Sequence, residues 1–178
     1  MAMKTGTQPI PSALAIFRQY KGLADKAMAQ LKPEELFICL EPESNSIAVI
    51  MKHLSGNMRS RWTDIFTSDG EKPSRQRDQE FEIFPTDTTE KLMEEWEKGW
   101  NTLFQTLESL TENDIGKIVT IRSEAHSVLE AMNRQIAHYS YHVGQIVFIA
   151  KAIRSHEWKT LSIARGHSDA YNQTLMKK

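Results

Sequence analysis

The chain has 178 residues, of which 40% are hydrophobic and 25% charged, which is the composition of an ordinary globular domain. Its formal net charge of −1 gives no electrostatic basis for binding nucleic acid or an anionic membrane surface. The single cysteine, Cys39, excludes an internal disulfide, and no apolar run approaches the ~18 residues that a membrane span requires. With no apolar signal segment at the start of the sequence, we expect one cytoplasmic domain over residues 1–178.

The first part of the chain predicts two helices. After a loose lead-in at residues 1–11, Ser12 is a candidate N-cap for a helix that ends near Pro33, because apolar residues follow helical spacing between these two points. A second apolar stripe predicts a helix over residues 44–66, with either of its first two residues as the cap.

A long polar connection follows at residues 67–86. Loops of ~20 residues are uncommon inside compact domains and are usually functional or crossovers. Fully extended, this one spans ~65 Å, which exceeds the ~30 Å length of a twenty-residue helix. The next predicted helix, over residues 87–110, can therefore run parallel to the helix before the connection, as in a crossover bundle.

The last part of the chain predicts a short strand or hairpin and one long helix. Residues 117–122 alternate and are β-branched, which favours a strand, and residues 123–127 lead into a helix over 128–153. The tail, residues 155–178, has apolar residues that can dock at its start and a polar, mobile end. The fold class is therefore all-α, a four-helix bundle with a long crossover between the second and third helices and a short β-hairpin before the last helix.

Two histidines, His138 and His142, lie four residues apart in the predicted last helix. Residues at this spacing share one helix face, about 6 Å apart along the axis. Two imidazoles so placed can converge on one metal ion, although the pair alone is a moderate signal and a third ligand must come from elsewhere. The alternative is that the pair only makes hydrogen bonds inside the bundle.

The best candidate for the third ligand is His53, on the core-side border of the second predicted helix. His126 and His156 lie too far from the pair along the same predicted helix, whereas His167, in the tail, is not excluded. Three neutral nitrogen ligands with a free coordination position are typical of a catalytic metal site. The ligand type admits Zn²⁺, Ni²⁺, Fe²⁺ or Mn²⁺ and does not choose among them.

Polar residues near these histidines are candidates to orient them or to contact a substrate. Asn57 and Gln145 each lie about one turn beyond a candidate ligand. Arg61 belongs to a group of arginines that could receive an anionic substrate, the alternative being a solvated face. The other members of this group are Arg59, Arg75 and Arg77.

Two motifs together resemble a known superfamily. They are the segment around His53, residues 45–54, and the segment that carries the histidine pair, residues 134–145. The combination is similar to the DinB/YfiT-like metal-binding four-helix bundles, and within them to a bacterial subgroup of unknown function. The similarity extends over nearly the whole chain.

The resemblance implies a crossover bundle, often a homodimer, in which three histidines matching His53, His138 and His142 hold a divalent metal ion. Some members are similar to transferases or isomerases that use a low-molecular-weight thiol such as bacillithiol or mycothiol. We therefore expect a metal-dependent enzyme acting on a small molecule, with or without a thiol. The alternatives are a non-catalytic ligand-binding or sensor module, and a metal that only staples a dimer.

Overall fold

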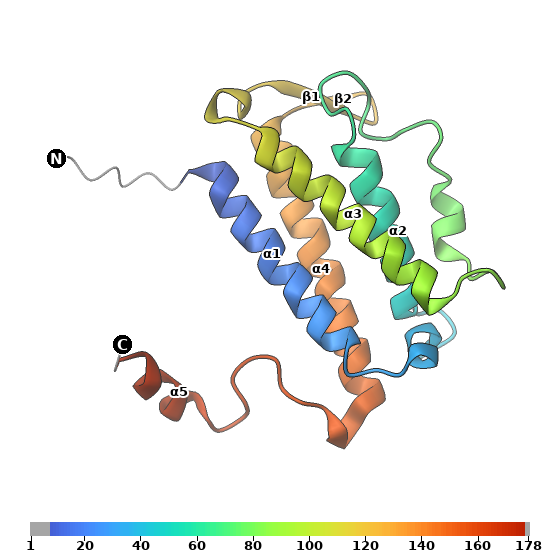
Figure 1. Cartoon of the computed structure of the whole chain (residues 1–178), viewed down its shortest axis with the longest axis vertical. Coiled ribbons are helices and arrows are strands. Elements are labelled where there is room, and N and C mark those ends of the chain that lie inside the picture. The colour runs from blue at the N-terminus through green and yellow to red at the C-terminus, as the bar shows by residue number, and fades with distance from the viewer. Residues whose placement is uncertain (1–7, 177–178) are drawn as a thin grey trace.

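The structure, a computed structural model, describes residues 8–176. Four long helices pack side by side, and a small antiparallel hairpin covers one end of the bundle (Figure 1). The helices are α1 (Pro9–Met28), α2 (Ile47–Trp62), α3 (Thr89–Ser109), α4 (Val128–Arg154) and the short α5 (Ser168–Leu175), and the strands are β1 (Ile118–Ile121) and β2 (Glu124–Ser127). The predicted all-α bundle with a hairpin before its last long helix is confirmed.

The two helices joined by the long connection run in the same direction. The backbone of Ser55 lies against Gly99, and seven residues further along both helices the Thr106 hydroxyl donates to the Trp62 carbonyl at 2.7 Å. Contacts that advance together along both helices require parallel axes. The chain between α2 and α3 runs back along the bundle and includes a 3₁₀ turn, η2 (Arg77–Phe81) (Figure 1). This is the predicted crossover.

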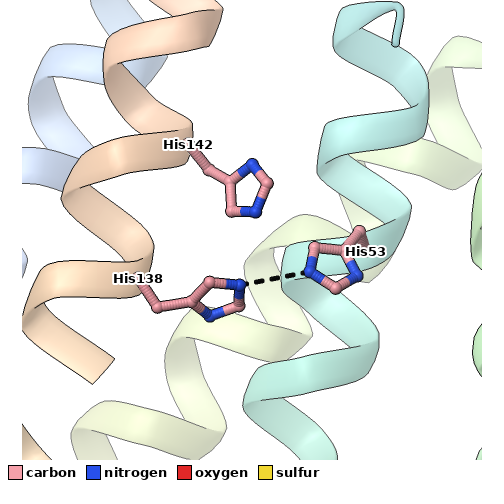
Figure 2. Close-up of side chains that lie close together, drawn as sticks. All are labelled: His53, His138 and His142. Carbon is pink, nitrogen blue, oxygen red and sulfur yellow. Dashed lines mark hydrogen bonds between the residues drawn. The ribbon is translucent and has the colours of Figure 1, made fainter. Parts of the chain in front are cut away.

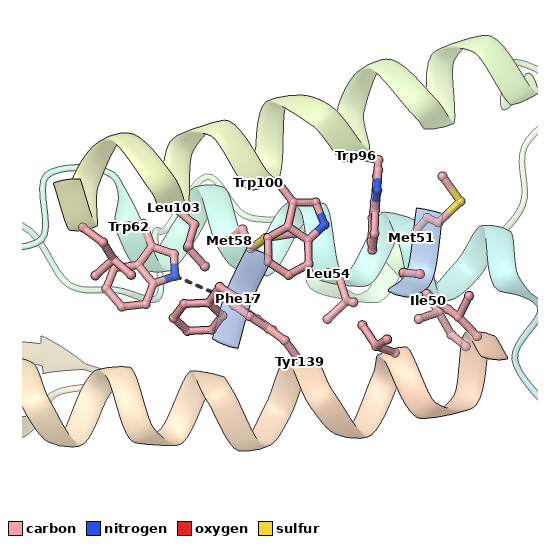
Figure 3. Packing of buried hydrophobic residues seen from close by; sticks show 14 of the residues in the cluster. Phe17, Ile50, Met51, Leu54, Met58, Trp62, Trp96, Trp100, Leu103 and Tyr139 are labelled. Atoms are coloured by element: carbon pink, nitrogen blue, oxygen red, sulfur yellow. Dashed lines mark hydrogen bonds between the residues drawn. The ribbon is translucent and has the colours of Figure 1, made fainter. Parts of the chain in front are cut away.

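The core is organised around aromatic side chains contributed by all four long helices (Figure 3). The ring of Phe17 on α1 lies 5.7 Å from Tyr139 on α4 and 6.5 Å from Trp100 on α3, distances at which aromatic pairs attract. The indole N–H of Trp62, on α2, donates to the Tyr139 hydroxyl at 3.2 Å. These contacts fix the separation of α2 and α4, which carry the candidate metal ligands.

The first helix begins earlier than predicted. It starts at Pro9, so the end of the expected lead-in is helical and Ser12 lies inside the helix; residues 1–7 lie outside the described part of the chain. Proline fits the first turn of a helix because its missing N–H has no partner there. Pro9 and Pro11 therefore begin the helix, whereas we expected them to keep the segment loose.

The other helix ends differ from the predictions by a few residues. Ser46 caps α2, accepting the Val49 N–H at 3.3 Å, in place of either predicted cap. The helix ends at Trp62, although the apolar stripe continues to Phe66, which is 45% exposed. Thr88 caps α3, its hydroxyl oxygen accepting the Lys91 N–H at 3.3 Å. Apolar spacing alone does not mark where a helix stops.

The hairpin is held by the start of the crossover. Its turn residues, Arg122 and Ser123, both have positive φ angles, 55° and 64°. The carboxylate of Asp69 accepts both of their backbone N–H groups at 2.8 Å, which offsets the strain of that turn. Residues 123–127, expected to lead into the last helix, form the second turn residue and all of β2, so His126 is a strand residue.

The C-terminal tail makes few contacts with the bundle. Trp158 and Leu161 pack partly buried against the core, but Ile163 is 41% exposed. All of α5 is exposed, and Figure 1 shows it away from the long helices. None of the helices within residues 8–176 has the length and apolar character needed to cross a membrane.

Candidate metal centre

The structure brings His53, His138 and His142 together. Their three rings point toward one another, one from α2 and two from successive turns of α4 (Figure 2). One ring nitrogen from each residue lies within 4.8 Å of the other two, and the Nε2 atoms of His53 and His138 are 3.2 Å apart. His53 is 6% exposed and His142 8%, so the cluster lies just below the surface.

A carboxylate on the crossover orients His53. The Nδ1 atom of His53 lies 3.0 Å from Oε2 of Glu80, in η2. Arg75 holds the same carboxylate through two bonds of 2.7 Å, from Nε and from Nη2. Burial alone would raise the pKa of Glu80, but the hydrogen bonds from His53 and Arg75 outweigh it and hold that pKa below its usual range. An ionised carboxylate only accepts, so His53 carries a proton on Nδ1, and a neutral ring then presents a bare Nε2 to the cluster.

Space for this carboxylate depends on Gly56, one turn beyond His53 on α2. A Cβ atom at position 56 would lie 2.1 Å from Oε1 of Glu80, far inside contact distance. Glycine leaves room for the Glu80 carboxylate beside His53, whereas a larger residue would displace this flexible side chain from its hydrogen bond. We did not anticipate Glu80 or Gly56; the available signal was a glycine inside a predicted helix, which often marks a close approach of another segment.

An amide orients the second ring. The side-chain oxygen of Gln145 lies 2.7 Å from Nδ1 of His142, and the Gln145 amide nitrogen donates to the Tyr141 hydroxyl at 3.2 Å. The amide oxygen is an acceptor, so the proton of a neutral His142 also lies on Nδ1 and its Nε2 is free.

The surroundings favour neutral rings at this site. Burial, followed by the charges that His142 and His53 would carry, lowers the pKa of His138 to about 3. Burial also lowers the pKa of His142 to about 4, against the hydrogen bond to Gln145. Neutral imidazole is the form that binds a metal ion, so near neutral pH these two residues need lose no proton to act as ligands.

The residues present fit a divalent ion. Among the residues that the structure describes, the cluster consists of three imidazoles and includes no carboxylate or thiolate. Two of the rings, His53 and His142, have their outward nitrogen bonded to a fixed acceptor, the arrangement that is general for metal-ligating histidines. Nitrogen donors of this kind suit Zn²⁺, Ni²⁺ and Fe²⁺.

The remaining predicted residues lie around the cluster without bonding to it. Asn57 is buried, and its side-chain oxygen accepts the Tyr139 hydroxyl at 3.0 Å. Arg61 is buried as well, bonded to the Gly70 carbonyl and to Glu71. The four arginines that we predicted as one group lie in two places. Arg59 pairs with Glu95 on the exposed face of α2 and α3. The other three line a cavity that is also lined by Asn57 and two of the histidines.

The two cavities nearest the crossover differ in their relation to the histidines. The cavity with the arginines has a volume of about 230 Å³ and is lined by His53 and His138. A larger cavity of about 730 Å³ lies between α2, α3 and the crossover, with Glu80 in its wall and no histidine. The smaller cavity is therefore the one that opens on the candidate metal centre.

Fold and site together define a crossover helical bundle with a three-histidine cluster able to hold a metal ion. The family DUF1572, described as a protein of unknown function, matches residues 4–167. The chain belongs to this family. No curated protein matches the chain at a significant level.

Proposed function

We propose that this chain is a divalent-metal-dependent enzyme of the DinB/YfiT-like class, acting on a small molecule through His53, His138 and His142. The observation that supports it best is the convergence of three imidazole nitrogens within 4.8 Å, with two of the rings fixed from outside by Glu80 and Gln145. Such pre-oriented, three-histidine ligand sets are typical of catalytic sites, whereas structural sites use four protein ligands.

An ion held there, Zn²⁺, Ni²⁺, Fe²⁺ or Mn²⁺, supplies Lewis-acid chemistry that lowers the pKa of a thiol or of water and so makes a nucleophile available at neutral pH. The protein's own groups bind and orient. Glu80 and Gln145 keep the protons of two rings on Nδ1, and the small cavity beside His53 and His138 receives the substrate. We propose a low-molecular-weight thiol as cosubstrate, on the basis of the resemblance.

Neither of the two tyrosines near the histidine cluster is well suited to transfer a proton to a substrate. Tyr139 is fully buried, burial raises its pKa, and its hydroxyl is occupied by Trp62 and Asn57. Tyr141 is 60% exposed, and its hydroxyl accepts from Gln145. The proposed chemistry therefore depends on the histidine cluster and the groups that orient it.

The test is turnover of a panel of electrophiles with bacillithiol, glutathione or cysteine, with and without a chelator. We expect thiol-dependent consumption of a substrate that the chelator and His138→Ala both abolish. The matched control is His156→Ala, because His156 is exposed and outside the cluster. Metal-dependent binding of a compound without turnover would instead support the ligand-binding module, and activity that survives both treatments would contradict the proposal.

A further inference from the structure

The small cavity beside the histidines is lined mainly by arginine. Five guanidinium groups reach it from four parts of the fold: Arg61 on α2, Arg75 and Arg77 on the crossover, Arg122 at the hairpin turn and Arg134 on α4. The other lining residues are His53, Asn57, Gln135 and His138. Its volume of about 230 Å³ is several times the ~30 Å³ that one molecule occupies in liquid water.

The carboxylates nearby do not balance these charges. Glu71 accepts from Arg61 at 3.0 Å and from Arg122 at 3.0 Å, and lies 3.3 Å from Arg75. Glu80 is bound by Arg75. Asp78 lies 3.9 Å from Arg77, and Asp69 acts on Arg61 through its charge. Four carboxylates therefore face five guanidinium groups, and positive charge exceeds negative charge by one.

Two of the arginines are free to bind a ligand. Arg134 makes no ion pair with any residue between 8 and 176. The nearest carboxylate to Arg77 is Asp78, 3.9 Å away and fully exposed, so solvent screens that pair. The guanidinium of Arg77 instead rests over the Phe81 ring, 5.0 Å from its centroid, which positions it without neutralising it.

Two residues that line the cavity each have a buried polar atom without a hydrogen-bond partner. Nε of Arg61, whose side chain is 5% exposed, has no hydrogen-bond acceptor, and Oε1 of Gln135, in a residue 2% exposed, has no donor. Buried polar atoms of this kind are usually paired, by protein, water or a ligand. Both residues also line a second, tight cavity of about 10 Å³ beside β1, and both atoms are shielded, so the ligand contacts are assigned to the exposed arginines.

We infer that this cavity binds the anionic group of the substrate, a carboxylate or phosphate on a small molecule, and so places the rest of that molecule against His53 and His138. Guanidinium groups recognise planar carboxylates and phosphates through paired hydrogen bonds. Arg77 and Arg134 make these bonds, and Arg61 and Arg75 supply fixed positive charge. The inference deepens the proposed function, because the bound molecule is the substrate of the histidine site.

Anion binding can be measured without the metal. Isothermal titration of chelator-treated, full-length protein with inorganic phosphate and, separately, with succinate distinguishes the two anion types. We expect millimolar or tighter binding of at least one. Arg77→Gln and Arg134→Gln should each weaken it about tenfold, since a hydrogen bond to a charged group contributes about that much. Both side chains lie at the surface end of the site, so circular dichroism should show both variants folded.

Arg59→Gln is the matched control. It also removes one positive charge, but Arg59 lies on α2 at the larger cavity and not at the arginine cavity. Anion binding should therefore be unchanged. Absence of binding by wild type, binding that survives Arg77→Gln and Arg134→Gln, or loss of binding in Arg59→Gln would each overturn the inference. Because His142 does not line the cavity, His142→Ala should lose the metal and still bind the anion, which separates failure of this inference from failure of the proposed metal site.

Discussion

The position of the His53 ring depends on a residue in the crossover, 27 positions away in the sequence. Its Nδ1 bonds to Glu80, Glu80 is held by Arg75, and Gly56 leaves the room that this arrangement needs. Removing such outer hydrogen bonds from metal-ligating histidines typically costs 10–100-fold in metal affinity.

Gly56→Ala should therefore weaken zinc binding about 10–100-fold, because the new methyl group pushes Glu80 away from His53. The fold should survive, since Glu80 is a flexible side chain that can move aside. Competition against a chromogenic chelator measures the affinity, and thermal unfolding checks the fold.

The controls for this prediction separate geometry from helix propensity. Gly22→Ala in α1 makes the same change in a helix where a Cβ meets nothing within 4 Å, so zinc affinity should not change. Glu80→Gln, which removes the charge without a steric clash, should weaken zinc to a similar extent. If Gly56→Ala binds zinc as tightly as wild type, Glu80 does not support the site.

Among the individual site residues, the sequence predicts those whose position on a helix face follows from helical spacing. The shared helix face identifies His138 and His142, and the core-side border of another helix identifies His53. Glu80 could not be found in this way, because it belongs to a single 3₁₀ turn in a long connection whose path follows no periodic pattern. Its acidic neighbours in the sequence, Asp78 and Glu82, look equivalent to it until the fold buries only one of the three.

Among the elements, the hairpin and the start of the crossover stabilise each other. Asp69 accepts the backbone N–H groups of Arg122, Ser123 and Glu71, and the Gly70 N–H donates to the Thr120 carbonyl at 2.7 Å. The hydrogen bond from the Glu71 N–H is the largest cause that lowers the pKa of Asp69, and those from the turn add to it, against a smaller opposing effect of burial.

Asp69→Asn should destabilise the protein by about 1 kcal/mol at pH 7, since a neutral amide accepts these hydrogen bonds more weakly than a carboxylate. The folded-state pKa is lowered, so the carboxylate stabilises the fold above its unfolded pKa of ~3.9 and this stabilisation is lost as pH falls through the folded value. The gap between wild type and Asp69→Asn should therefore narrow in acid.

Urea denaturation of both proteins at neutral pH and near pH 3 measures that gap. Asp78→Asn is the control, because Asp78 is fully exposed and should show no gap at either pH. A difference that stays constant or grows in acid would show that Asp69 does not act through its charge.

Element ends were the least predictable part of the fold. Proline in the first turn of α1 extended the helix, and Ser46 capped α2 although Ser44 and Asn45 offered equivalent side chains. Several adjacent residues could serve as caps, and tertiary packing selected one of them.

Over the whole molecule, the parallel packing of α2 and α3 depends on a second glycine. A Cβ atom at Gly99 would lie 2.9 Å from Cα of Ser55, a backbone atom that cannot move without the helix. Gly99→Ala should therefore destabilise the bundle by about 1–3 kcal/mol, the usual cost of overpacking.

Gly22→Ala again provides the control and should stabilise the protein by about 0.5–1 kcal/mol, the ordinary gain in a helix. Denaturant unfolding measures both. The two substitutions should thus have different effects: Gly56→Ala should change metal affinity, and Gly99→Ala should change the free energy of unfolding. Equal stability of Gly99→Ala and Gly22→Ala would mean that α2 and α3 do not pack this closely.

The homodimer implied by the resemblance remains a prediction. On α4 the side chains of Tyr141 and Phe148 are 60% and 67% exposed, with Gly144 between them on the same face. We propose this face as the contact between two copies. Phe148→Glu should then give a monomer by light scattering, whereas Ile118→Glu, at an equally exposed residue on the hairpin, should not. A wild-type monomer, or a Phe148→Glu dimer, would contradict the proposal.

The sequence predicted the bundle and its crossover because apolar periodicity and connection length constrain them directly. The arginine cavity was only partly predictable. Arg122 and Arg134 lie on elements far from the crossover arginines in the sequence. Docking of the hairpin on the crossover brings Arg122 to the cavity, and packing of α4 in the bundle brings Arg134.

The central claim is that three histidines from two helices hold one metal ion. Elemental analysis of protein purified without a nickel column tests it most directly, with His53→Ala, His138→Ala, His142→Ala and the control His156→Ala beside wild type. We predict one divalent ion per chain in wild type and in His156→Ala, and little or none in the other three. Wild-type protein without stoichiometric metal even after incubation with zinc, or a metal content unchanged by all three cluster substitutions, would contradict it.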